Sequence, residues 1–167
     1  MNVKDLELLF DYAYWANGKL LSVISKLSPE EFKRPVGGSY ESVRNTMVHI
    51  LSAEWGWLSR CGGKERGPRL NAADFPSLES VLEVWGKVEG YVREFLSVLK
   101  DEDMVRNIEF VDDRAGSHSM PLVELMHHAM NHGVHHRGQL ALLLRLLGRE
   151  PGNFDILFYY AGKPDAG

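Results

Sequence analysis

The stretch MHHAMNHGVHHRGQL occupies residues 126–140 and decides the fold. It holds five of the seven histidines and lies inside an apolar run that predicts one long helix over residues 121–147. Residues four apart share a helix face, so His132 and His136 can point at the same ion. Histidine is also the commonest metal ligand in proteins.

The phase of this helix predicts which histidines face inward. One stripe at helical spacing carries Leu125, Ala129, His132, His136, Leu140, Leu143 and Leu147. His128 and His135 share a more polar stripe, and His127 also lies off the apolar one. Two core-facing imidazoles need a polar partner because an unpaired buried polar group is costly. A metal would serve both, but ordinary hydrogen-bonded core histidines would give the same pattern, and a metal site needs a third ligand.

The rest of the chain predicts an all-α fold, a four-helix bundle in which the histidine-rich helix comes fourth. The other long helices are expected over residues 3–27, 42–59 and 78–99, and a short one begins at Ser28. A short β-hairpin is expected between residues 103 and 119, with His118 exposed. Gly148 and Pro151 should end the fourth helix. The aromatic tail 153–160 should pack on the bundle or on a second subunit.

Some polar and aromatic residues remain open to two interpretations. His49 lies in the second long helix, where phase alone favours a hydrogen-bonded core histidine over a ligand. Arg137 could bind an anionic substrate, although a salt bridge or an exposed position is the stronger expectation. Gly133 predicts close helix packing, since glycine inside a helix costs about 1 kcal/mol relative to alanine. Tyr12 and Trp15 are expected in the core.

Composition bounds the function. The chain has 167 residues, 44% of them hydrophobic and 25% charged, with a net charge of −4. This predicts a single domain over residues 1–167 and argues against nucleic-acid binding, because no basic stripe is present. Cys61 is the only cysteine, which fits a reducing cytosol, and it is expected in a loop as a bystander. No run approaches the ~20 apolar residues of a membrane span, and no signal peptide is evident. We expect a soluble, cytoplasmic protein.

Several motifs together resemble one family. Together they are similar to the sequence pattern of the DinB/YfiT-like metalloprotein superfamily. The matching motifs are Asn131-His132, His136-Arg137-Gly138-Gln139, Trp15-Ala16-Asn17, the segment from Ser42 through His49 to Trp55, and the ending Asp155 to Tyr160. The resemblance implies a four-helix bundle in which His49, His132 and His136 hold one divalent metal. It also implies a homodimer. Related proteins include thiol-dependent S-transferases and a thiol-dependent isomerase, whereas many others have no known activity.

Such a site implies chemistry at an open metal position. Three imidazoles leave room for water or a thiol, whose pKa a metal lowers. Zinc and nickel both suit imidazole. The resemblance to thiol-dependent proteins implies a metal-dependent enzyme that activates a low-molecular-weight thiol cosubstrate for transfer to a small molecule. The alternatives are a hydrolase using metal hydroxide, and a non-catalytic metal-binding stress protein.

Overall fold

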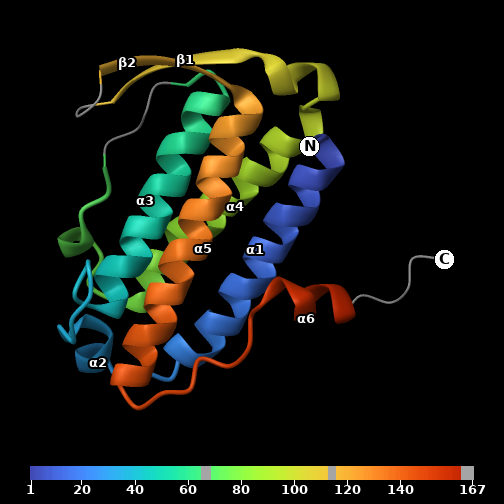
Figure 1. Ribbon diagram of the computed structural model, residues 1–167. Coiled ribbons are helices and arrows are strands. Elements are labelled where there is room, and N and C mark those ends of the chain that lie inside the picture. The colour runs from blue at the N-terminus through green and yellow to red at the C-terminus, as the bar shows by residue number, and fades with distance from the viewer. Residues whose placement is uncertain (65–68, 113–115, 163–167) are drawn as a thin grey trace.

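Four long helices form the body of the molecule in the computed structural model, which describes residues 1–64, 69–112 and 116–162 (Figure 1). They are α1 (Val3–Ile24), α3 (Val43–Cys61), α4 (Leu78–Val98) and α5 (Leu122–Leu146). The short helices α2 (Pro29–Lys33) and α6 (Ile156–Ala161) and the 3₁₀ turns η1 (Ala72–Asp74) and η2 (Asp101–Val105) connect and flank them. The predicted helical bundle with a small hairpin is confirmed.

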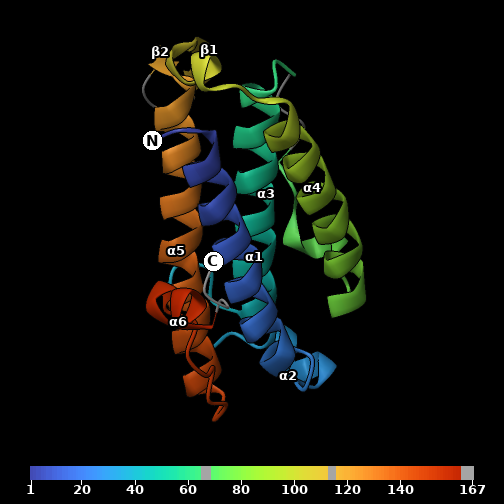
Figure 2. The same cartoon turned by 90° about the vertical axis from the view of Figure 1, so that its right-hand side faces the viewer.

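The hairpin and α2 lie at opposite ends of the bundle (Figure 2). Strands β1 (Asn107–Asp112) and β2 (Gly116–Pro121) pair antiparallel, with Phe110 opposite His118. The expected turn includes residues 113–115, which lie outside the described residues. His118 is only partly exposed, because its ring stacks on Phe110 at 5.2 Å.

Local hydrogen bonds set the helix ends. Ser28 caps α2 in a capping box with Glu31, and Ser42 caps α3 by accepting from the Asn45 N–H at 3.1 Å. Gly148 follows the C-terminal cap of α5 with a φ of 72°, which suits glycine, and the Arg149 N–H donates back to the Leu144 carbonyl at 2.8 Å. This confirms the predicted end of the histidine-rich helix.

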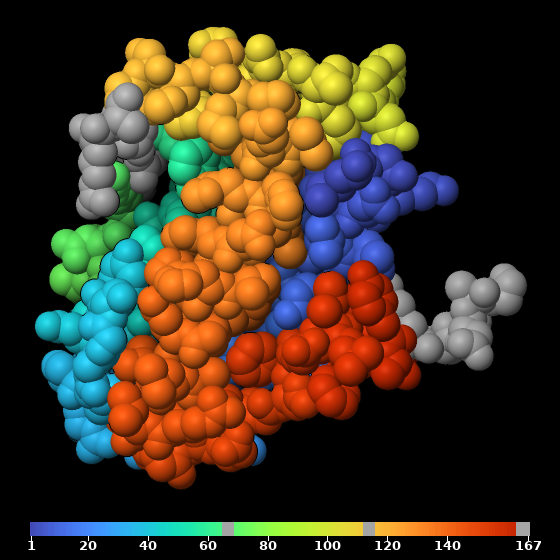
Figure 3. Space-filling view, viewed as in Figure 1, coloured from blue at the N-terminus to red at the C-terminus, as the bar shows by residue number. Residues whose placement is uncertain are grey.

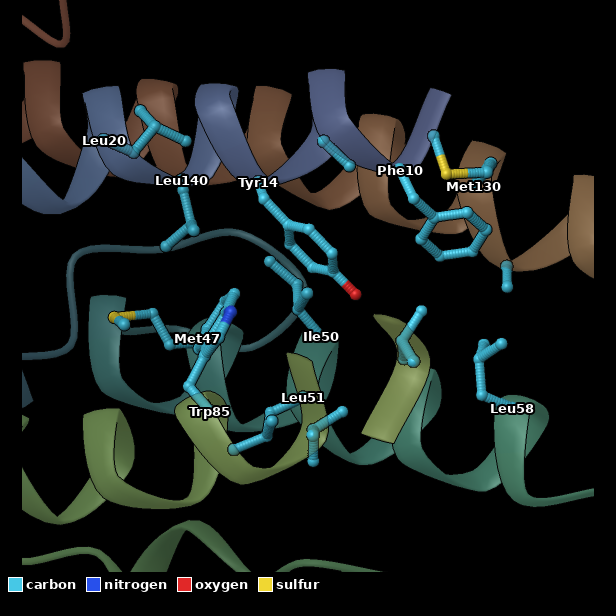
Figure 4. Close-up of a cluster of buried hydrophobic side chains, with 14 of the residues drawn as sticks. Phe10, Tyr14, Leu20, Met47, Ile50, Leu51, Leu58, Trp85, Met130 and Leu140 are labelled. Carbon is cyan, nitrogen blue, oxygen red and sulfur yellow. The ribbon is translucent and has the colours of Figure 1, made fainter. Parts of the chain in front are cut away.

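The core lies between the four long helices, and Figure 4 shows side chains of α1, α3, α4 and α5 meeting there. Cys61 belongs to it: the expectation of a loop position is wrong, because α3 continues to Cys61 and buries the thiol completely. Burial raises the pKa of this thiol to about 12. Such a thiol is an inert core group rather than a nucleophile.

The tail packs on the bundle as predicted. The Tyr12 hydroxyl donates to the Phe154 carbonyl at 3.2 Å, and the Tyr159 ring lies 5.8 Å from the ring of Tyr12 and 5.6 Å from that of Trp15. Helix α6 thus rests against α1. Over the described ranges, the helices lack the length and apolar character that crossing a membrane requires.

Candidate metal centre

Three histidines from two helices converge on one point. His49 comes from the first half of α3, and His132 and His136 come from successive turns of α5. The Nε2 atom of His49 lies 3.0 Å from Nε2 of His132 and 3.1 Å from Nε2 of His136. One nitrogen from each ring can be chosen so that all three lie within 4.8 Å of one another.

This spacing fits a divalent metal. Zinc–nitrogen bonds of about 2.0–2.1 Å separate two ligand atoms by roughly 2.9–3.4 Å for bond angles between 90° and tetrahedral. The two measured Nε2 separations fall in that range. Three imidazoles leave further coordination positions open, as in catalytic rather than closed structural sites.

The imidazoles are held in their neutral form. Burial, followed by the charge of His136, lowers the pKa of His49 to about 4. Burial, followed by the charges of its histidine neighbours, lowers the pKa of His132 to about 3. The pKa of His136 is also lowered, mainly by burial. Near neutral pH each ring is therefore neutral and has one nitrogen with a free lone pair, which metal binding requires.

Gln139 orients His136. The Nδ1 atom of His136 lies 2.8 Å from Gln139 Oε1, an acceptor, so the ring carries its proton on Nδ1 and keeps Nε2 free. Gln139 in turn donates from Nε2 to Ser39 Oγ at 3.4 Å and to His135 Nε2 at 3.0 Å. Within the described ranges, no corresponding partner holds Nδ1 of His49 or His132.

Tyr40 is a further residue of the site, and no motif or spacing in the sequence predicted it. Its ring stacks on that of His49 at 4.0 Å, and its hydroxyl lies 3.0 Å from His49 Nε2. The chain reaches this position through a tight loop closed by the Val36 N–H and the Glu41 carbonyl at 2.8 Å. Gly37, Gly38 and Glu41 all have positive φ in this loop.

The other histidines of α5 lie outside the cluster, as the helical phase predicts. His127, His128 and His135 are exposed. The His128 ring packs on Trp57 at 4.8 Å and stays 6.1 Å from the His132 ring. His49 is half-buried, and its Nε2 atom faces the two histidines of α5.

Arg137 also differs from expectation. The side chain is buried, only 3% exposed, rather than on the surface. Its guanidinium donates to Asn17 Oδ1 at 3.4 Å and lies over the Tyr12 ring. It also occupies the space above Gly133, where an added Cβ would sit 3.1 Å from Arg137 Nη1. The glycine therefore makes room for an arginine of its own helix.

Comparisons with known proteins identify the family of this chain. The family model described as "DinB family" matches residues 1–166. "Protein DinB" of Bacillus subtilis (strain 168) is 22% identical over 156 residues, covering 90% of this chain and 91% of that protein. "Uncharacterized protein YizA" of the same organism is 23% identical over 142 residues, covering 85% and 87%.

A solved structure shares the fold. The crystal structure of a DinB-like protein from Bacillus cereus ATCC 10987 superposes with a TM-score of 0.74 at 22% identity, covering 91% of this chain and 97% of that one. The family model spans nearly the whole sequence, and the same order of helices recurs in a protein of similar length. The chain belongs to the DinB family.

Proposed function

We propose that His49, His132 and His136 bind one divalent metal ion, zinc or nickel, and that the protein is a metal-dependent enzyme acting on a low-molecular-weight thiol. The observation that carries the proposal is the convergence of three neutral Nε2 atoms at 3.0 and 3.1 Å. A divalent ion held there lowers the pKa of a thiol beside it, so the thiolate is available near neutral pH.

The chain's own residues have separate tasks in this proposal. Gln139 keeps the proton of His136 on Nδ1. Tyr40 brings a hydroxyl to within 3.0 Å of His49 Nε2, where it can hydrogen-bond to the reacting sulfur or to the electrophile. The cluster itself contains histidines and no carboxylate among the described residues, so a thiol or a water molecule would depend on the metal for its deprotonation. The preference for a thiol transferase over a hydrolase rests on the resemblance to thiol-dependent proteins.

Metal content is the first test. Tag-free wild type, His132→Ala and His128→Ala should be compared by mass spectrometry. His128 is the matched control, since it lies one turn earlier on α5 and is exposed. We expect about one metal per chain in wild type and His128→Ala and a loss in His132→Ala. A wild type that stays metal-free after incubation with excess zinc and nickel would overturn the proposal.

Thiol binding and turnover distinguish a metal-dependent enzyme from a protein whose metal only stabilises the fold. The cobalt-substituted protein should change its absorption spectrum when cysteine is added, because the sulfur enters an open position. With 1-chloro-2,4-dinitrobenzene as electrophile, a carbon–sulfur bond forms, the carbon–chlorine bond breaks, and chloride and the thiol proton are released. Faster thioether formation that depends on the metal supports the transferase. If the cobalt absorption spectrum does not change when cysteine is added, a non-catalytic metal-binding protein is favoured.

We also propose a cytoplasmic homodimer. A reducing compartment suits a thiol substrate, and apolar side chains are exposed along α5 and α6, which form one continuous face (Figure 3). They include Leu146 and Phe158, whereas α1 exposes no large apolar side chain. Light scattering should give twice the chain mass for wild type and for Val98→Glu on α4, and a lower mass for Phe158→Glu. A monomeric wild type would refute the dimer.

A further inference from the structure

A buried polar network lies behind the three histidines. It joins Arg137 of α5, Glu54 of α3 and two residues of α1, Asn17 and Tyr14. Arg137 is 3% exposed and Asn17 is 6% exposed. Arg137 Nη1 donates to Asn17 Oδ1 at 3.4 Å, and the Tyr14 hydroxyl donates to Glu54 Oε1 at 2.9 Å. Three motifs of the sequence, around Asn17, Glu54 and Arg137, therefore meet between the same helices.

The network and the histidines lie on different sides of the α3–α5 contact. Glu54 follows His49 by five residues, and Arg137 follows His132 by five residues. With 3.6 residues per turn, five residues correspond to a rotation of about 140° around each helix. The histidines thus face the Tyr40 side, while Glu54 and Arg137 face α1.

Three donors of this network lack acceptors. Arg137 Nε and Nη2 and Asn17 Nδ2 are buried and have no hydrogen-bond partner in the described part of the chain. A buried guanidinium with two of its three nitrogens unpaired is costly. The charge of Glu54 favours the charged form of Arg137, and the charge of Arg137 lowers the pKa of Glu54. No Arg137 nitrogen donates a hydrogen bond to the Glu54 carboxylate, since Nη1 bonds to Asn17 and the other two are unpaired within the described residues. Ordered water between them would satisfy both the free donors and the free carboxylate lone pairs.

We infer that Arg137 and Glu54 form a water-bridged charge pair that sets the rotation of α5 against α3 and α1 and thereby positions His132 and His136 opposite His49. Arg137 and Glu54 are positioning residues in this inference, which rests on the proposed metal site. Arg137 follows His136 directly on one rigid helix, so a turn of α5 that breaks the network also moves the imidazoles.

A small rotation of α5 displaces the imidazole nitrogens by more than metal–ligand distances tolerate. An imidazole nitrogen about 6 Å from the helix axis moves by about 1 Å when the helix turns by roughly 10°. Metal–ligand distances tolerate only about 0.2 Å. The guanidinium is also tightly placed, since it fills the space above Gly133. A small change in the rotation of α5 about its axis should therefore lower the metal affinity without unfolding the bundle.

The test compares Arg137→Met, Glu54→Gln and their double variant with wild type. Arg145→Met is the matched control, because Arg145 lies on the same helix with its side chain 55% exposed. Cobalt affinity is measured by competition with a chromophoric chelator, together with the cobalt absorption spectrum. We expect Arg137→Met and Glu54→Gln to bind cobalt about 10-fold more weakly, with an altered spectrum. Arg145→Met should match wild type.

The double variant tests the pair itself. Its cobalt affinity and its metal-free urea midpoint should be close to those of Arg137→Met alone, because either single change already removes the pair. A folded Arg137→Met protein with wild-type affinity and spectrum overturns the positioning role. If Arg137→Met does not fold, Glu54→Gln decides, since it keeps an acceptor for Tyr14; wild-type cobalt binding by that variant overturns the inference.

Failure of the proposed function gives a different result. A wild type that does not bind cobalt refutes the metal site and with it the positioning role. The metal-free urea midpoints still report on the charge pair in that case. Strictly additive losses in the double variant would then overturn the pair as well, whereas non-additive losses support it.

Discussion

Gln139 holds one histidine of the cluster in a single tautomer, through the 2.8 Å contact between its Oε1 and His136 Nδ1. Leucine at this position keeps the volume but removes the acceptor. We expect Gln139→Leu to weaken zinc binding by about 10-fold or more, in the range found for groups that orient metal ligands. Competition with a chromophoric chelator measures the affinity. His135→Ala is the control, because it removes only the contact between Gln139 Nε2 and His135 Nε2. Equal zinc affinities in wild type, Gln139→Leu and His135→Ala would contradict the role of Gln139.

Glu54 should make stability depend on pH. Burial raises the pKa of its carboxyl to about 7, against the lowering effects of the Tyr14 hydrogen bond and of Arg137, and Glu89 of α4 raises it further. The folded protein thus binds more protons than the unfolded chain between about pH 4.5, the ordinary value, and pH 7. The stability that Glu54 contributes is full below this window and is lost as the pH rises through 7.

Glu54→Gln removes this titration and substitutes none of the three histidines, so the wild type and the variant carry the same other titratable groups. We expect the free energy of unfolding of metal-free wild type to fall relative to that of Glu54→Gln as the pH rises from 4.5 to 7, and the difference to level off above. Urea unfolding of both proteins at several pH values measures it. Parallel curves across the window would show that the Glu54 carboxyl titrates alike in the folded and unfolded chains.

Within α5, two glycines offer a matched pair of substitutions. A Cβ added at Gly138 meets nothing within 4 Å, whereas one at Gly133 would lie 3.1 Å from Arg137 Nη1. Gly138→Ala should raise the free energy of unfolding by about 0.5–1 kcal/mol through helix propensity alone. Gly133→Ala gains the same propensity but must displace the guanidinium, so its net gain should be smaller or negative. Chemical denaturation of the two variants checks the order; a larger gain at Gly133 would contradict it.

The elements show what the sequence could and could not predict. The apolar period fixed α5 to within one residue at each end, and it separated His132 and His136 from the exposed histidines of the same helix. Local patterns of this kind depend only on neighbours one or two turns away. The place of Tyr40 beside His49 was not predicted, because it depends on a loop with left-handed backbone. The burial of Arg137 was not predicted, because its partner Asn17 lies 120 residues away in the sequence.

At the scale of the whole molecule, the histidine cluster joins two helices that are far apart in the sequence. His49 of α3 and His132 of α5 are separated by 83 residues, and α4 and the hairpin lie between them in the chain. A metal bound only by the folded arrangement would stabilise the entire bundle, since the unfolded chain does not hold the three nitrogens together. The proposed site is therefore also a clamp between α3 and α5.

Metal removal should consequently lower the thermal stability of the protein. At a free metal concentration 100 times the dissociation constant, binding to the folded state alone contributes about 2.7 kcal/mol. For a chain of this length that corresponds to a fall in Tm of roughly 5–10 °C on adding a chelator.

Scanning calorimetry of wild type, His132→Ala and His128→Ala, each with and without chelator, measures the effect. Wild type and His128→Ala should respond and His132→Ala should not, because exposed His128 lies outside the cluster. A response in His132→Ala equal to that of wild type would mean that the stabilising metal binds elsewhere.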